Sequence, residues 1–214
     1  MKITKLGHCA LVLENEGTRI LTDPGSFTVE QNKSAQGINI ILITHEHGDH
    51  FHVPSIHEVL KNNPKAVVVS NSAVAKLLEA ENVPCMVVGD GQSANVNNLL
   101  IEGFGKDHAP IYGTMGLVEN TGYFVANKFY FPGDNFHQPG KPVEVLALPT
   151  AGPWMKISEA IDFAKAVKPR AAFAIHDGMI VPGFAGFVAQ MVQNFLKPGG
   201  TEFVALEAGE AKEF

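Results

Sequence analysis

Short apolar runs separated by turn residues open the chain, which is the pattern of β-strands joined by hairpins. Further along, apolar positions recur every three or four residues in segments that alternate with β-branched runs, which predicts a sheet covered by helices. We predict strands at 3–6, 10–14, 18–22, 38–44, 66–69, 85–88, 99–104, 117–125, 128–131, 143–148 and 171–175, and helices at 54–62, 71–81, 157–168 and 184–196.

The last of these helices has the clearest periodicity. Its apolar positions recur at steps of three and four, so we expect that face to pack on the core and not to bind a cofactor. They are Phe184, Phe187, Val188, Met191 and Phe195.

Two successive halves of the chain each run from strands into helices. This order predicts two sheets packed face to face with helices outside, although the halves share no sequence identity. A chain of 214 residues is an ordinary length for one layered α/β domain, so we predict a single domain over residues 1–214.

Composition narrows the class of protein. Hydrophobic residues make up 45% and charged residues 18%, as in compact folded proteins, and the net charge of −6 opposes binding to a nucleic-acid backbone. No run approaches the roughly 20 apolar residues of a membrane span, and the N-terminal segment is too short for a signal peptide. Cys9 and Cys85 lie far apart, which predicts reduced thiols in a cytoplasmic protein, both serving to fill the core. The sequence gives no indication of oligomeric state.

Candidate chemistry is concentrated in His45-Glu46-His47-Gly48-Asp49-His50, directly behind the apolar run 38–44. Imidazole and carboxylate groups are the ligands that zinc, manganese and iron share. On an extended segment, His45 and His47 point the same way and can bind one ion, whereas Asp49 and His50 diverge toward a second. The hexapeptide therefore predicts metal chemistry.

Other apolar runs also lead to a residue able to bind a metal. If the strands lie side by side, their ends converge on one edge of the sheets, where ligand sites of α/β proteins form. Two metals would need a bridging carboxylate; Asp134 is the best placed acid, and Gly133 permits the turn that aims it. The residues at these strand ends are Asp23, His45, His108, Asp134 and His176.

The motif His45-x-His47-x-Asp49-His50 and the residues that accompany it in order resemble the metallo-β-lactamase superfamily. Four further segments resemble the small bacterial metal-dependent hydrolases related to ascorbate-phosphate lactonase: Gly7-His8-Cys9-Ala10, Thr22-Asp23-Pro24, Pro132-Gly133-Asp134-Asn135 and Ala174-Ile175-His176-Asp177-Gly178. The resemblance implies a four-layer αβ/βα sandwich of two mixed sheets, with a site for two divalent metal ions in the cleft. It implies that one metal is held by His45, His47 and His108, the other by Asp49, His50 and His176, and that Asp134 bridges them.

Departures from related classes refine the expected chemistry. Lactamases with a cysteine ligand would need a cysteine near Asp134, and flavodiiron oxidases have a glutamate where this chain has His47, so hydrolysis is favoured. We expect two ions, zinc first and manganese or iron as alternatives, to activate a bridging water that attacks an ester, lactone or phosphoester of a small molecule. Asp49 and Asp134 are the predicted catalytic residues, with Asp49 accepting the proton.

Several alternatives stay open. The protein could be a phosphodiesterase acting on nucleotides or phospholipid head groups, with Lys33, Lys106 and Lys156 as candidate anion-binding groups, or a metal-binding sensor without catalysis. Glyoxalase-type thioesterase and RNA-processing activities also remain, although no C-terminal substrate domain or basic tract supports them.

Some residues have two readings from sequence alone. Asp23 either opens the turn at Pro24-Gly25 or orients a ligand histidine from behind, and we favour the second reading. Trp154, Lys156 and Tyr112 are candidates for substrate contact, although Trp154 could equally cover the core. Four histidines are left out of the ligand set. His57 is expected on the surface of a helix, and an ordinary structural role is favoured over lining the pocket for His8, His52 and His137.

Overall fold

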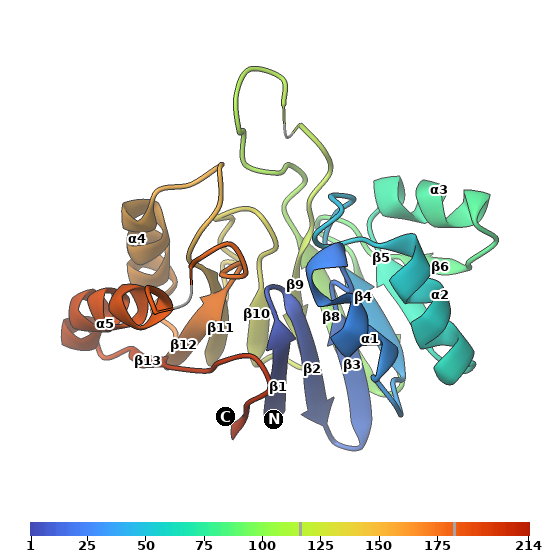
Figure 1. Cartoon of the computed structure of the whole chain (residues 1–214), viewed down its shortest axis with the longest axis horizontal. Coiled ribbons are helices and arrows are strands. Elements are labelled where there is room, and N and C mark those ends of the chain that lie inside the picture. Colours follow the sequence, from blue (N-terminus) through green and yellow to red (C-terminus); the bar gives the residue numbers. More distant parts are fainter. Residues whose placement is uncertain (116, 182) are drawn as a thin grey trace.

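The computed structural model describes residues 1–115, 117–181 and 183–214. Within these residues the strands form two seven-stranded sheets, and helices lie on the outer side of each sheet (Figure 1). The predicted pair of mixed sheets with helices outside is confirmed.

The first sheet begins with antiparallel pairs and continues with parallel ones. β14, β1, β2 and β3 pair antiparallel in that order, and the pairs β3–β4, β4–β5 and β5–β6 are parallel. The bounds are β14 (Ala211–Glu213), β1 (Lys2–Gly7), β2 (Ala10–Asn15), β3 (Thr18–Thr22), β4 (Ile40–Ile43), β5 (Val67–Ser70) and β6 (Cys85–Val87).

The second sheet repeats this scheme. β7 to β10 pair antiparallel, and β10 to β13 pair parallel, so each half of the chain has the same strand arrangement despite its different sequence. The bounds are β7 (Ser93–Val96), β8 (Leu99–Phe104), β9 (Gly122–Val125), β10 (Phe129–Phe131), β11 (Val145–Pro149), β12 (Ala171–Ile175) and β13 (Glu202–Val204).

Helices cover both sheets, and the start of α3 has a side-chain cap. Asn71 accepts a hydrogen bond from the amide of Val74 and so caps α3. The helices are α1 (Val29–Lys33), α2 (Val53–Asn62), α3 (Ser72–Ala80), α4 (Ile157–Val167) and α5 (Ala185–Leu196), with short 3-10 turns at Ser26–Thr28 and Lys197–Gly199.

Three apolar cores hold the layers together. The largest lies between the sheets, where Leu42 of the first sheet and Phe131 of the second are fully buried. A second joins the first sheet to α2 and α3 through residues such as Ile56, and a third joins the second sheet to α4 and α5. Burial of each large aliphatic or aromatic side chain contributes about 1.5–3 kcal/mol, so both sheets are fixed on both faces.

Helix α5 packs differently from the sequence prediction. Phe184, Phe187 and Phe195, predicted to face the core, leave 50%, 61% and 52% of their surface exposed. The buried row consists of Val188, which the prediction included, and of Val192 and Leu196, spaced by four residues. Small aliphatic side chains let the helix approach the sheet closely, which leaves the aromatic row beside the contact and open to solvent.

Elements at the sheet edges were also missed or overextended. The prediction omitted β7, β13, β14 and α1, whose short polar sequences lack a clear period. The predicted strand 117–125 is confirmed only from Gly122, because the amides of Asn120 and Thr121 donate to loop carbonyls of Lys106 and Thr44. Both cysteines are free; Cys9 is buried as expected, but Cys85 is only half-buried on edge strand β6. No helix in the described part of the chain is long and apolar enough to cross a membrane.

Candidate metal centre

The strand ends singled out in the sequence meet in the structure. Asp23 follows β3 and His45 follows β4 in the first sheet, whereas Asp134 and His176 follow β10 and β12 in the second. His108 lies four residues beyond β8. Because all these strands end at the same side of the sandwich, their terminal residues face one another across the two sheets.

The hexapeptide folds into a compact turn beyond β4. The carbonyl of His47 accepts hydrogen bonds from the amides of His50 at 2.9 Å and Phe51 at 2.8 Å, which closes the turn that carries Asp49 and His50. Gly25 lies directly against this turn: a Cβ atom on it would come within 1.7 Å of the Asp49 carbonyl oxygen. The turn therefore depends on a glycine at position 25.

Histidine and carboxylate side chains gather into adjoining clusters. In each cluster the potential ligand atoms lie within 4.8 Å of one another. The clusters are His45, His47 and His108; His8, Asp49, His50 and His176; and His45, His50 and Asp134. All seven residues predicted as metal ligands are thus brought together.

Asp134 lies between the histidines of the first two clusters. Its Oδ2 atom is 3.3 Å from His108 Nε2 and 2.9 Å from His176 Nε2, and its Oδ1 atom is 3.2 Å from His50 Nε2. The backbone turn that places it runs through Gly133 at φ +65°, where a Cβ atom would meet Asn120 Oδ1 at 2.3 Å. This is the position that a carboxylate shared by two ions would need.

Five ring nitrogens in the clusters are buried without a hydrogen-bond partner among the described residues. They are Nδ1 of His176 and the Nε2 atoms of His45, His50, His108 and His176. A buried polar atom without a partner costs about 1–3 kcal/mol, so four Nε2 atoms that face one volume indicate a site for a ligand. Imidazole nitrogens facing carboxylates fit a divalent metal ion.

In three of these histidines the other ring nitrogen, Nδ1, has a hydrogen-bond partner, and that partner determines which ring nitrogen carries a proton. Nδ1 of His50 donates to Asp23 Oδ2 at 2.7 Å, and Nδ1 of His108 donates to the carbonyl of Ala109. The Thr44 hydroxyl donates to Asp23 Oδ2, so it accepts from Nδ1 of His45. Each ring therefore carries a proton on Nδ1, which leaves Nε2 as the nitrogen that faces the centre and binds a metal when it is deprotonated. Asp23 orients His50 directly and His45 through Thr44.

Charge divides the ligand histidines into two kinds. Burial lowers the pKa of His45 and of His47, so both are neutral near pH 7 and able to bind a metal. Burial acts the same way on His176, but its contacts with Asp134 and Asp49 outweigh this and raise its pKa to about 9. The pKa of His50 is likewise raised, because the attraction of Asp134 exceeds the effect of burial. The metal-free centre thus holds protons where a metal would bind.

Metal uptake is therefore expected to release protons. At pH 7 His176 is protonated, since its pKa is about 9, and an incoming cation must displace that proton. The apparent affinity for Zn²⁺ should rise as the pH increases from 7 toward 9. Calorimetric titration of the metal-free protein at pH 7, in buffers of different ionisation enthalpy, measures the protons released. A titration that releases none would contradict the charge assignment.

The other candidate residues lie at different distances from the centre. Trp154 is buried beside it, with its ring centroid 6.0 Å from those of His108 and His176. Lys156 is exposed at the start of α4, and Tyr112 is 85% exposed on the loop after His108. His52 accepts or donates a hydrogen bond with Ser55 at the start of α2. The remaining candidates are exposed and outside the clusters: Lys33, Lys106, His57 and His137.

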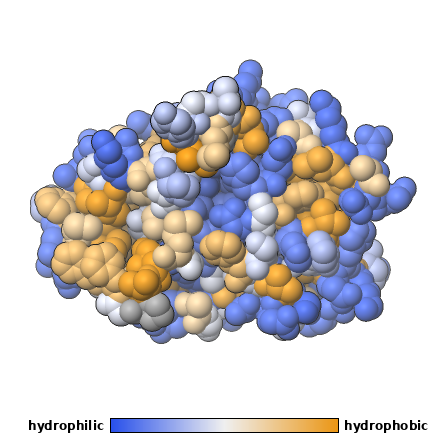
Figure 2. All heavy atoms as spheres, turned by 45° about the horizontal axis from the view of Figure 1, so that its top comes forward, coloured by the Kyte–Doolittle hydropathy of each residue, from blue (hydrophilic) through white to orange (hydrophobic). Residues whose placement is uncertain are grey.

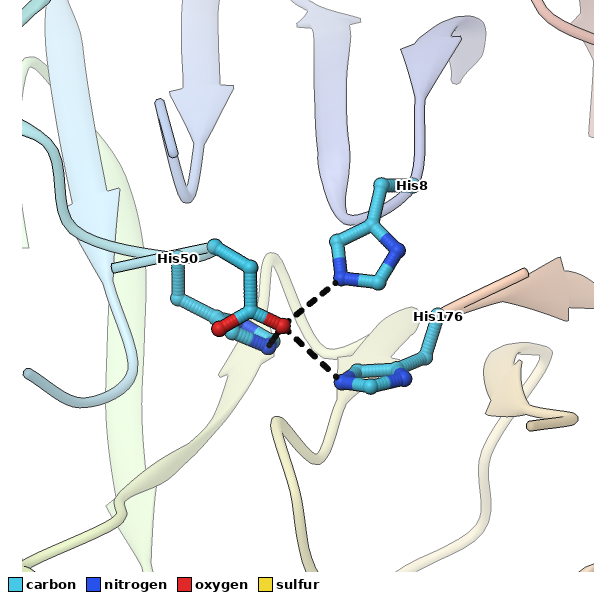
Figure 3. Close-up of side chains that lie close together, drawn as sticks. His8, His50 and His176 are labelled. Atoms are coloured by element: carbon cyan, nitrogen blue, oxygen red, sulfur yellow. Dashed lines mark hydrogen bonds and ion pairs between the residues drawn. The ribbon is translucent and has the colours of Figure 1, made fainter. Parts of the chain in front are cut away.

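His8, which the sequence analysis left out of the ligand set, lies in the second cluster with Asp49, His50 and His176 (Figure 3). Its position in Gly7-His8-Cys9-Ala10 was the available signal. Thr44 and Gly25 were also missed, because neither side chain type indicates a role in a metal centre.

The surface around the centre combines polar and apolar regions. Figure 2 shows a hydrophilic hollow near the middle of the face that carries the loop after His108, with apolar side chains on both sides. Large apolar side chains are exposed on this loop and in the segment after β12. They are Tyr112, Met115, Leu117, Met179, Val181 and Phe184.

Comparison with known proteins supports a common family. The sequence model for the family described as the beta-lactamase superfamily domain matches residues 2–176. Protein Rv0786c of Mycobacterium tuberculosis is 36% identical over 191 residues, covering 87% of this chain and 88% of that protein. The UPF0173 metal-dependent hydrolase Atu1317 of Agrobacterium fabrum is 37% identical over 114 residues, covering 47% of each chain.

Solved structures share the fold. Igni18, a metallo hydrolase from the hyperthermophilic archaeon Ignicoccus hospitalis, superposes with a TM-score of 0.79 over 100% of this chain and 98% of its own, at 20% identity. YhfI from Bacillus subtilis, a metallo-beta-lactamase fold protein, superposes with a TM-score of 0.75 at 12% identity, over 99% and 98% of the two chains. At these identities the likeness shows the fold alone, and it agrees with the predicted four-layer αβ/βα sandwich.

Proposed function

This chain belongs to the metallo-β-lactamase superfamily, and from that premise we propose that it is a hydrolase that uses two divalent metal ions to cleave an ester or lactone of a small molecule. The observation that carries the proposal is the set of four buried, unpartnered Nε2 atoms facing Asp134. A folded protein does not leave such a group unpaired without a ligand for it.

The clusters divide the ligands between two positions. His45, His47 and His108 would hold one ion, Asp49, His50 and His176 the other, and Asp134 would contact both. Bound divalent ions supply an acidic water, with a pKa near 7 on zinc, and polarise the oxygen of the bond to be cleaved. We propose zinc first, with manganese or iron as alternatives that the same ligands accept.

The two carboxylates have different roles in handling protons. Asp134 exposes 4% of its side chain, whereas Asp49 exposes 22% and reaches the edge of the cluster. Contacts with His176 and His8 overcome the effect of burial and lower the pKa of Asp49, so it is a carboxylate throughout the neutral range. The greater exposure of Asp49, at the edge of the cluster, is what would let it accept the proton of the attacking water and pass it to solvent.

The charges around the centre support an uncharged carbonyl substrate. Among the described residues, the ion pairs of Asp49 and Asp134 all involve histidines. Lys33 pairs with Glu30 on α1, and Lys106 and Lys156 are exposed outside the clusters. The buried Lys5 is paired with Asp177, and no lysine or arginine among the described residues pairs with a member of the clusters, so an uncharged ester or lactone fits better than a phosphodiester.

Metal removal and substrate choice test the proposal together. The chelator-treated protein should hydrolyse none of a panel of lactones, carboxylic esters, thioesters and phosphodiesters, and two equivalents of Zn²⁺ or Mn²⁺ should restore cleavage of a lactone or ester. Full activity without metal would exclude the mechanism. Preferred cleavage of a phosphodiester would favour the phosphodiesterase alternative, and tight binding of two ions with no turnover of any substrate would favour a sensor.

A further inference from the structure

His8 is held at three points between the two sheets. It lies in the turn between β1 and β2, and its backbone carbonyl accepts a hydrogen bond from the amide of His176 at 3.2 Å. Its ring is buried, with Nε2 3.1 Å from Asp49 Oδ2 and Nδ1 3.2 Å from the amide nitrogen of Gly178. The residue thus connects the hexapeptide turn with the loop after β12.

The contact with Gly178 fixes the proton on the His8 ring. A backbone amide can only donate, so Nδ1 of His8 must be the acceptor. A neutral imidazole has one acceptor nitrogen, and the proton is therefore on Nε2, where it is donated to Asp49 Oδ2. This is the reverse of His45, His50 and His108, whose Nδ1 atoms carry a proton and whose Nε2 atoms face the centre.

The reversed arrangement separates His8 from the ligand histidines that surround it. With Nδ1 accepting from Gly178, His8 has no lone pair left to bind an ion, although its ring centroid is only 4.3 Å from that of His176. The atom it contacts, Asp49 Oδ2, is also the one that faces His50 Nε2 at 3.6 Å and His176 Nε2 at 3.5 Å. Figure 3 shows the three rings around this carboxylate oxygen.

We propose that His8 is a positioning residue for the second metal position, acting through Asp49. Donation from Nε2 holds Asp49 Oδ2 toward His50 and His176, as hydrogen-bonded neighbours hold metal-binding carboxylates generally. The inference rests on the proposed function, since it assumes that Asp49, His50 and His176 bind an ion.

Two substitutions of His8 separate its contacts. Asparagine places its Oδ1 near the position of Nδ1, keeps the acceptor for Gly178, tolerates a positive φ and is too short to reach Asp49. Glutamine extends a donor toward Asp49 and gives up the Gly178 contact. In calorimetric titration with Zn²⁺, His8→Asn should bind the second equivalent about 10–100-fold more weakly than the wild type, with the first equivalent unchanged. His8→Gln should bind both equivalents within about threefold of the wild-type affinities.

A second variant reaches the same contact without changing His8. The backbone of Gly178 has an ordinary conformation, but a Cβ atom there would lie 3.0 Å from Nδ1 of His8 and 3.2 Å from its Cβ atom. Gly178→Ala should displace the His8 ring and weaken binding of the second equivalent of Zn²⁺ as His8→Asn does. This variant keeps the inference testable if His8→Asn fails to fold.

The titrations distinguish this inference from the proposed function. A wild type that binds fewer than two equivalents of Zn²⁺ would contradict the function itself. If the wild type binds two, equal binding by His8→Asn would overturn the positioning role, and an equal loss in both His8 variants would assign His8 as a direct ligand instead.

Discussion

Replacing Asp134 with asparagine is expected to leave a folded protein that binds two metal ions poorly and hydrolyses its substrate about a thousandfold more slowly. Asp134 contacts His108, His176 and His50, and it is the carboxylate that lies between the two clusters. Asparagine has the same shape but no charge, so the variant tests the negative charge separately from packing.

The expected size follows from the charge that is lost. Attraction by these histidines outweighs burial and lowers the pKa of Asp134 well below its usual value, so it is ionised at every pH of interest. Two unit charges 4 Å apart attract by about 4 kcal/mol at an effective dielectric constant of about 20. Because each 1.4 kcal/mol corresponds to a factor of ten, losing this attraction predicts about 10³-fold weaker binding and a similar loss in kcat/KM.

A matched control removes a neighbouring carboxylate that faces solvent. Asp107 precedes His108 and is exposed outside the clusters, so Asp107→Asn should retain wild-type metal content and activity. Metal content by elemental analysis, kcat/KM and thermal melting of the metal-free proteins would be compared. An Asp134→Asn protein with two bound ions and activity within tenfold of the wild type would show that Asp134 does not bridge.

The metal centre was predictable from sequence because it contains residue types that the packing of a core does not explain. Two histidines, an aspartate and a third histidine within six residues have no structural explanation, and single aspartates and histidines at other strand ends identify their partners. The layered fold followed from the alternation of strand and helix patterns, because parallel strands need helical crossovers.

Features that depend on the third dimension were not predictable. The period of α5 showed that the helix has an apolar face. It did not show that Val188, Val192 and Leu196 would be buried while Phe187 stays exposed. The motif around His8 indicated that the residue matters but not its role, which follows from the direction of one backbone amide, that of Gly178. A sequence shows which groups are present, whereas proton positions depend on neighbours that only the fold supplies.

The same limit applies to Gly25, whose importance lies in a backbone contact. Replacing it with alanine is expected to remove the second metal ion, lower activity about a hundredfold or more and destabilise the metal-free protein by about 3 kcal/mol. The new Cβ atom would lie 1.7 Å from the carbonyl oxygen of Asp49, 2.1 Å from its carbonyl carbon and 2.6 Å from the amide nitrogen of His50. All three atoms are backbone, so no side-chain rotation relieves the clash.

Neither partner in this contact is free to move away. The carbonyl of Gly25 accepts from Asn32 Nδ2 at 3.0 Å and its amide donates to Asp23, while the facing turn is closed by hydrogen bonds to the carbonyl of His47. The turn carrying Asp49 and His50 must therefore shift, and a displacement of about 1 Å at a catalytic group can cost about 10²-fold in rate.

Gly48→Ala provides the control within the same turn. A Cβ atom on Gly48 has nothing within 4 Å, although this residue lies between His47 and Asp49 and is closer in sequence to the ligands than Gly25 is. If spacing in sequence decided the outcome, Gly48→Ala would be the more damaging change. Because close approach in space decides it, Gly48→Ala should keep Zn²⁺ binding, melting temperature and kcat/KM near wild-type values, and Gly25→Ala should lose all three. Equal behaviour of the two variants in these measurements would show that the contact of Gly25 with the turn does not hold the centre.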